Sequence, residues 1–70
     1  MAYLVWDLHP GYAYSGNVPH WYPTAYVPDI ISAKRWASGH TQSMITEHCD
    51  EEAFRLYQTK QLPQTYKVIP

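Results

Sequence analysis

The first residues of the chain have the alternating pattern of a β-strand. Residues 2–8 are rich in strand-favouring types and are followed by Pro10, which donates no backbone hydrogen bond to a neighbouring strand. One face of this strand would carry Leu4, Trp6 and Leu8, and the other Tyr3, Val5 and Asp7. Because both faces are partly apolar, we expect this strand to lie in the middle of a sheet.

Residues 10–28 form the most unusual segment of the sequence. The segment holds four prolines, two glycines and five large aromatic residues, and prolines at this density exclude a helix. Residues that precede proline favour extended geometry, so we expect residues 20–27 to be extended. Residues 12–14 suit a short strand and residues 15–17 a turn. We interpret the whole segment as an ordered loop or an irregular hairpin.

Residues 29–39 have the pattern of a helix. Asp29 is a good N-cap, and Gly39 suits the position just after a helix end. The apolar stripe of this helix would comprise Ile30, Ile31, Ala33, Trp36 and Ala37. A hairpin with its turn at residues 38–40 is the alternative, and the agreement of cap, stripe and stop signal favours the helix.

The remaining residues predict a strand, a helix and a final strand. Residues 41–48 alternate, with Met44, Thr46 and His48 on one face. The acidic run at residues 50–52 suits a helix N-terminus, where the helix dipole favours negative charge. The apolar stripe of this second helix would comprise Ala53, Phe54, Leu56, Tyr57 and Lys60. Residues 64–69 give the last strand.

This order of elements predicts an α+β fold in a single domain over residues 1–70. We expect a three- or four-stranded, mainly antiparallel sheet, two short helices that cover one face of it, and an aromatic- and proline-rich loop. A chain of 70 residues builds only one small core, and Cys49, its one cysteine, cannot form an intramolecular disulfide. A small, apolar and unstapled domain of this kind is expected to form a homodimer.

Charge is scarce and the formal net charge is −1, so a strongly basic nucleic-acid-binding footprint is missing. No lysine or arginine precedes Lys34. The lone cysteine favours a reducing compartment, and the first residues lack the basic and apolar regions of a signal peptide. No apolar run reaches the length of a membrane span. We therefore expect a cytoplasmic protein that does not bind membranes.

Histidine and cysteine are the side chains best suited to metal or nucleophile chemistry. A zinc site could be imagined from His20, His40, His48 and Cys49, but their spacing matches no usual ligand pattern. The chain has no glycine-rich phosphate loop, no nucleophile elbow and no paired-cysteine motif. We therefore expect no enzyme activity, no catalytic residue, no metal and no cofactor, and we keep a small metal-binding protein as the last alternative.

The aromatic residues of the segment 10–28 are the strongest functional signal: Tyr12, Tyr14, Trp21, Tyr22 and Tyr26. Tyrosine and tryptophan dominate binding hot spots, and prolines reduce the ordering cost of binding. We predict a protein-binding module that uses these rings. A small phage- or mobile-element-encoded inhibitor that blocks a host or defence protein fits the size and charge. The alternatives are a single-stranded nucleic-acid binder that stacks bases on the same rings, and rings that only fill the core.

Overall fold

The computed structural model describes residues 1–11, 18–40 and 42–70. Within them the elements are β1 (Ala2–His9), β2 (His20–Val27), α1 (Ile30–Ala37), β3 (Ser43–His48), α2 (Asp50–Thr59) and β4 (Lys67–Ile69). The strands pair antiparallel in the order β2-β1-β3-β4, which confirms the expected α+β fold and the place of β1 inside the sheet. The helical interpretation of residues 29–39 is also confirmed, while the predicted features at residues 12–17 lie outside the described residues.

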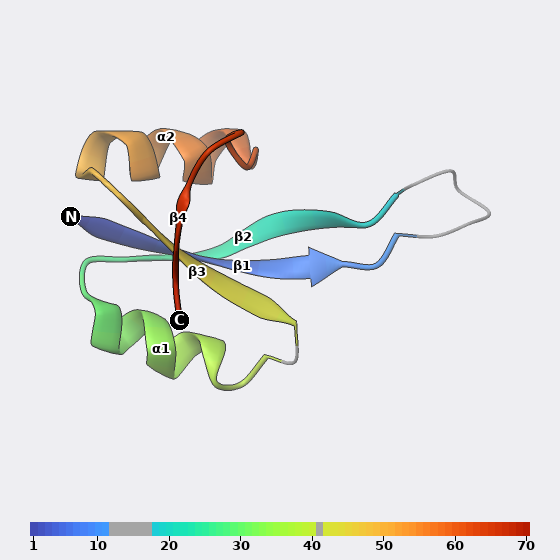
Figure 1. The fold of residues 1–70 in the computed structure, drawn as a ribbon, viewed down its shortest axis with the longest axis horizontal. Coiled ribbons are helices and arrows are strands. Elements are labelled where there is room, and N and C mark those ends of the chain that lie inside the picture. The colour runs from blue at the N-terminus through green and yellow to red at the C-terminus, as the bar shows by residue number, and fades with distance from the viewer. Residues whose placement is uncertain (12–17, 41) are drawn as a thin grey trace.

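The two helices cover opposite faces of the sheet, so the prediction that both cover one face is wrong (Figure 1). Leu4 and Trp6 of β1 pack with Ala53 and Leu56 of α2. The intervening Val5 packs on the other face with residues of α1 and β3. Successive side chains of a strand point to opposite faces, so a strand that is apolar on both needs a cover on each.

The largest buried side chain is Trp6, on the face that α2 covers. It has no exposed surface, and its indole nitrogen donates to the hydroxyl of Thr46 on β3 at 2.8 Å. A buried indole N–H needs such a partner, because an unpaired one costs about 1–3 kcal/mol. Trp6 therefore connects the apolar core to a buried polar group of the neighbouring strand.

The helix α1 begins at Asp29, as predicted. The carboxylate of Asp29 accepts hydrogen bonds from the backbone N–H of Ser32 at 2.7 Å and from its hydroxyl at 2.9 Å. These two hydrogen bonds hold the pKa of Asp29 below its ordinary value. At the other end, Gly39 is not in the left-handed conformation expected of a C′ glycine, and the N–H of His40 instead bonds the Ala37 carbonyl at 3.0 Å.

The pairing of β1 with β2 contains an irregularity. Val5 pairs with Ala25 while Trp6 pairs with Pro23, so Thr24 is an extra residue in β2. The hydroxyl of Thr24 donates to the Val5 carbonyl at 3.2 Å. Because β2 lies at the edge of the sheet, it tolerates a proline and a bulge that an inner strand would not.

The last elements follow the predicted order with shorter bounds. The backbone at Cys49 is extended and caps α2 without a side-chain hydrogen bond, and three acids fill the first turn of the helix. The helix ends at Lys60, which has a φ of 60° in the left-handed region. The final strand β4 covers Lys67–Ile69, whereas the sequence pattern predicted residues 64–69. Residues 64–66 connect to it without strand pairing.

Candidate functional site

An aromatic patch lies where α2 meets the edge strand β2. The ring of Tyr26 on β2 makes edge-to-face contacts with Phe54 and Tyr57 of α2, with ring centroids 6.4 and 6.2 Å apart. The Tyr26 hydroxyl also donates to the backbone carbonyl of Asp50 at 3.4 Å. All three rings remain exposed, by 37% for Tyr26, 55% for Phe54 and 38% for Tyr57. These three residues, named here the aromatic patch, form an ordered apolar surface.

Tyr22 lies further along β2 and contacts Lys60 at the C-terminal end of α2. The ammonium of Lys60 lies 5.3 Å from the centroid of the Tyr22 ring, within the range of a cation–π interaction. The pKa of Lys60 is above its ordinary value, first because of a side-chain hydrogen bond with Tyr22 and then because of Coulombic attraction to it. Lys60 therefore places a positive charge beside Tyr22, just after the last turn of α2.

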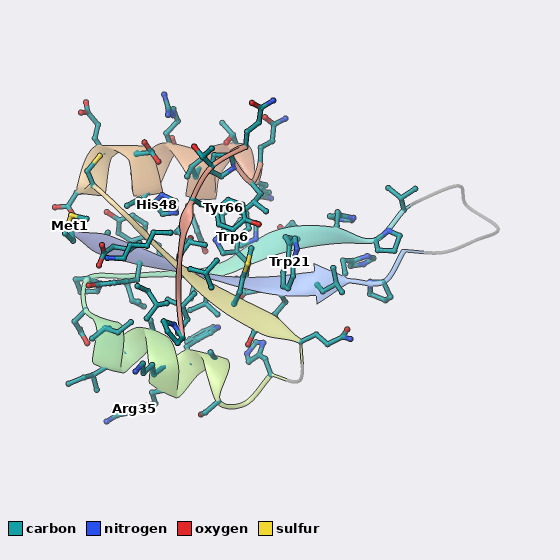
Figure 2. All side chains as sticks on the ribbon, viewed as in Figure 1. Met1, Trp6, Trp21, Arg35, His48 and Tyr66 are labelled. Carbon is teal, nitrogen blue, oxygen red and sulfur yellow. The ribbon has the colours of Figure 1, made fainter. Side chains whose placement is uncertain are left out.

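The residues predicted to bind a partner do not all lie together. Tyr22 and Tyr26 are exposed on β2, and Tyr26 belongs to the aromatic patch. Trp21 is half-buried and packs against the core cluster under α2 (Figure 2). Tyr12 and Tyr14 lie outside the described residues. The segment 10–28 therefore contributes both core and surface, which the sequence alone left open.

Phe54 and Tyr57 were assigned by the sequence to the buried stripe of the second helix, and this assignment is wrong. The helix buries Ala53 and Leu56, while Phe54 and Tyr57 are exposed. All four positions fall on one broad face, but a short helix on a narrow sheet covers only part of such a face. The signal that could have separated them is size, because the small Ala53 allows close approach to the sheet and Phe54 does not.

A buried polar network connects β1, β3 and α2. The Trp6 indole donates to Thr46 Oγ1, which lies 2.7 Å from His48 Nε2, and His48 Nδ1 lies 3.1 Å from Glu52 Oε1. Since the indole only donates, the Thr46 hydroxyl is free to donate to His48 Nε2, which leaves Nδ1–H to donate to Glu52. The carboxylate–imidazole–hydroxyl order resembles a hydrolase triad. However, Thr46 has no exposed surface, so the network serves the core and its hydroxyl offers no nucleophile to a substrate.

The residues imagined for a zinc site are dispersed. The ring of His20 stacks on that of His9 with centroids 5.0 Å apart, at the far end of the β1–β2 pair. His48 is buried under α2, His40 follows α1, and Cys49 is exposed. Among the described residues no three histidine, cysteine, aspartate or glutamate side chains gather in a metal-binding group.

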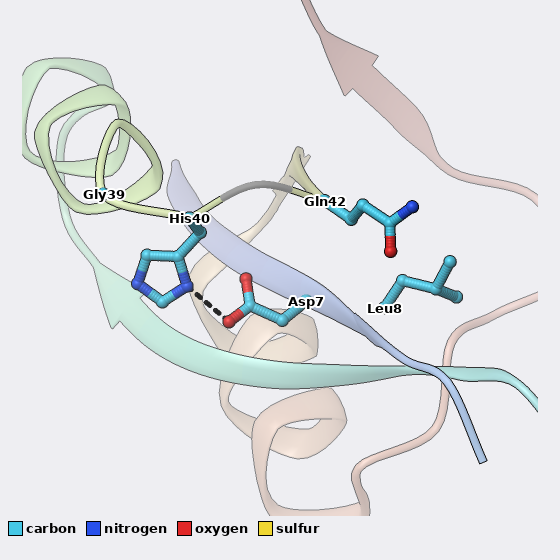
Figure 3. A pocket seen from close by; sticks show the side chains of 5 residues that line it. All are labelled: Asp7, Leu8, Gly39, His40 and Gln42. Carbon is cyan, nitrogen blue, oxygen red and sulfur yellow. Dashed lines mark hydrogen bonds and ion pairs between the residues drawn. The ribbon is translucent and has the colours of Figure 1, made fainter. Parts of the chain in front are cut away.

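The contact between Asp7 and His40 lies between two hollows of the surface. His40 Nδ1 contacts Asp7 Oδ2, in a hollow of about 270 Å³ that Leu8, Gly39 and Gln42 also line (Figure 3). The other carboxylate oxygen of Asp7 is buried and accepts no hydrogen bond from the described residues. His40 also lines a second hollow, of about 500 Å³, which extends along α1. Asp7 thus fixes an imidazole at the border of both hollows.

The second hollow contains a large exposed ring that the sequence assigned to the core. Trp36 is 48% exposed, and Ile31 of the same predicted stripe is 69% exposed, so this part of the predicted stripe is wrong. Only Ala33 of α1 is fully buried, because the helix approaches the sheet closely at this small residue. The centroids of the Trp36 and His40 rings are 6.3 Å apart, with a tilt of 31° between the ring planes.

The basic residues do not form one surface. Lys34 and Arg35 lie on α1, and Figure 2 shows Arg35 projecting away from the sheet. Arg55 and Lys60 belong to α2 and its cap, on the other side of the sheet. Lys67 on β4 pairs with Glu47 at 3.4 Å. The aromatic patch and the Lys34–Arg35 pair are therefore separated by the sheet.

No helix in the described parts of the chain is long and apolar enough to cross a membrane. Comparison of the chain with protein-family models, with curated proteins and with solved structures found no match to any of the three.

Proposed function

We propose that this chain is a non-enzymatic protein-binding module and that the aromatic patch is its contact surface. The observation that supports this proposal is the exposure of Tyr26, Phe54 and Tyr57 within one cluster of edge-to-face contacts. Burying a ring such as Phe54 is worth about 1.5–3 kcal/mol, which the isolated chain forgoes at this position. A partner surface that covers the patch would recover this free energy.

The order of the patch adds to the proposal. The contacts among the rings and the Tyr26–Asp50 hydrogen bond restrict their rotamers before any partner arrives. Each flexible side chain that a partner must immobilise costs about 0.5–1.5 kcal/mol, so a pre-ordered surface binds more tightly for the same area. Large aromatic anchors at the centre of an interface are also the residues that dominate binding free energy.

The charges at the two ends of the patch give its partner an orientation. The acids Asp50 and Glu51 lie in the first turn of α2, and Lys60 caps its last turn. Asp50 already pairs with the N-terminal ammonium at 3.5 Å, so a matching partner surface is apolar at its centre, basic opposite Glu51 and acidic opposite Lys60. Rim charges of this kind affect the association rate and its salt dependence more than the affinity.

The narrower prediction is that the target is a host or defence protein and that binding blocks its activity. This prediction rests on the small size, the mild acidity and the absence of catalytic motifs in the sequence. The patch is also the surface through which a homodimer would form. A second copy and an unrelated protein would compete for the same rings, and the two cases are separated by the mass of the isolated protein in solution.

The experiment compares three immobilised chains incubated with lysate of the source organism or its host. They are the wild type, the double variant Phe54→Ala/Tyr57→Ala and the control Ile31→Ala, which removes an even more exposed side chain from α1. We expect one protein to be retained by the wild type and by Ile31→Ala and lost from the double variant. Thermal unfolding of all three shows that the fold is intact. Retention of the same proteins by all three chains would contradict the proposal.

Light scattering of the purified chain tests the homodimer. A mass of twice the 8.2 kDa of the monomer, returning to 8.2 kDa in the double variant, would assign the patch to self-association. A mass of 8.2 kDa in all variants leaves the patch available to another protein.

A further inference from the structure

The hollow beside α1 has features that the proposed protein-binding function does not use. Its lining includes Val27 of β2 and Ser32, Arg35 and Trp36 of α1, and it ends at His40. It lies on the face of the sheet opposite the aromatic patch, since Val27 packs with the α1 cluster and Phe54 belongs to α2. Its volume of about 500 Å³ falls within the roughly 300–1,000 Å³ typical of small-molecule sites.

The rings of Trp36 and His40 differ in arrangement from the rings of the aromatic patch. The rings of the patch meet edge-on, at interplanar angles of 88° and 71°. Trp36 and His40 instead have 31° between their planes and 6.3 Å between their centroids. Trp36 is 48% exposed, so a planar group can stack on its indole with an edge beside His40.

The Asp7 carboxylate makes His40 a defined wall of the hollow. It contacts Nδ1, so the imidazole is oriented and Nε2 remains for a ligand. The imidazole is held by this contact with Asp7, and the exposed Trp36 offers its ring to a ligand.

Arg35 supplies the positive charge that lines this hollow. Lys34 precedes it on α1 and lines a neighbouring hollow. The Asp7 carboxylate contacts His40, and Asp29, which caps α1, interacts electrostatically with Arg35. The C-terminal end of α1 is itself unfavourable for an anion, so a negative group would lie at the side of the helix next to the Arg35 guanidinium.

We infer that this hollow binds a nucleobase with its phosphate, the base stacking on the exposed indole of Trp36 beside His40 and the phosphate contacting Arg35. The source of this chemistry is either a free nucleotide or one unit of a single-stranded nucleic acid. One stacked base and one charged contact give a dissociation constant on the order of 1 mM for a mononucleotide. In a single strand Lys34 contacts the adjacent phosphate, and binding becomes tighter and salt-dependent.

The test follows the indole and imidazole NMR signals of the protein during titration with dAMP, up to about ten times the expected dissociation constant. We expect dAMP to shift the signals of Trp36 and His40 but not that of the buried Trp6. The variant Trp36→Ala should weaken binding by about tenfold or more, and Ile31→Ala on the same helix should leave it unchanged. Inorganic phosphate alone should not move the Trp36 signal.

A short oligodeoxyadenylate distinguishes the two sources. For a single strand that contacts Lys34 and Arg35, the logarithm of the affinity should fall with the logarithm of the salt concentration with a slope of about −1.4. An affinity per strand no better than that of dAMP would assign the hollow to a free nucleotide. The inference is overturned if neither ligand shifts Trp36, or if Trp36→Ala binds as tightly as the wild type. Neither result affects the aromatic patch, because Phe54 and Tyr57 lie across the sheet.

Discussion

The buried network of Trp6, Thr46, His48 and Glu52 leads to the most quantitative prediction. Replacing Thr46 by valine keeps the shape of this fully buried side chain and removes only its hydroxyl. That hydroxyl accepts from the Trp6 indole at 2.8 Å and contacts His48 Nε2 at 2.7 Å. The substitution therefore leaves one donor and one acceptor unpaired inside the core.

The magnitude follows from these two lost contacts. Each unpaired buried group costs about 1–3 kcal/mol, so Thr46→Val should lower the free energy of unfolding by about 2–6 kcal/mol. A chain of this length has a total stability of roughly 3.5–10 kcal/mol, at about 0.05–0.15 kcal/mol per residue. The thermal midpoint should fall by roughly 8–48 °C, since 1 kcal/mol corresponds to about 4–8 °C in a domain of this size.

Urea unfolding followed by circular dichroism measures this loss, with Thr46→Ser as the matched control. Serine keeps the hydroxyl and removes one methyl group, which costs about 1 kcal/mol. We expect the order of stability to be wild type, then Thr46→Ser, then Thr46→Val. Valine favours strands more than serine does, so packing and strand propensity alone predict the reverse order for the two variants. A valine variant as stable as the wild type, or more stable than the serine variant, would refute the role of the network.

Other predictions concern α1. Asp29→Ala should lower the urea midpoint of unfolding at neutral pH. Because folding lowers the pKa of Asp29 below its ordinary value of 3.8, the difference between wild type and variant should shrink as the pH falls from 3.8 through the folded pKa. Ala33→Leu should lower the free energy of unfolding by about 1–3 kcal/mol, because it overpacks a buried position. Lys34→Leu on the same helix should change it by no more than about 0.5 kcal/mol, and urea unfolding measures both. Trp36→Phe should shift the tryptophan emission maximum to shorter wavelength, because it removes the exposed indole and leaves the buried Trp6 and the half-buried Trp21.

The sequence was sufficient for the elements and their order, because local signals determine them. Asp29 and the acidic run at residues 50–52 mark helix starts, and both helices begin there. The placement of the helices on the sheet was less accessible. Because both faces of β1 are apolar, β1 was expected to be a central strand, and the same observation required a helix on each face. Which helix covers which face depends on the order of the strands, which long-range pairing determines.

The candidate sites were only partly predictable, because the width of the sheet beneath the helices cannot be read from the helix pattern. The apolar stripes of the two helices include Ile31, Trp36, Phe54 and Tyr57, all of which are exposed. Helices of eight and ten residues on a narrow sheet bury little more than Ala33, Ala53 and Leu56. A stripe shows which face of a helix is apolar, but the width of the sheet beneath it decides how much is covered. The pairs Tyr26–Phe54 and Trp36–His40 form where an apolar helix face extends beyond the sheet and stays exposed.

The two edges of the sheet affect how such a chain behaves when it is concentrated. Pro23 lacks the N–H with which an outer strand would bind a neighbour, the bulge at Thr24 breaks the register beside it, and β4 has only three residues. Neither edge offers the long, uninterrupted row of backbone groups on which strands from other molecules add one after another into a fibril. The chain therefore exposes large rings beside sheet edges that, in its described residues, give other copies no long template for fibril growth.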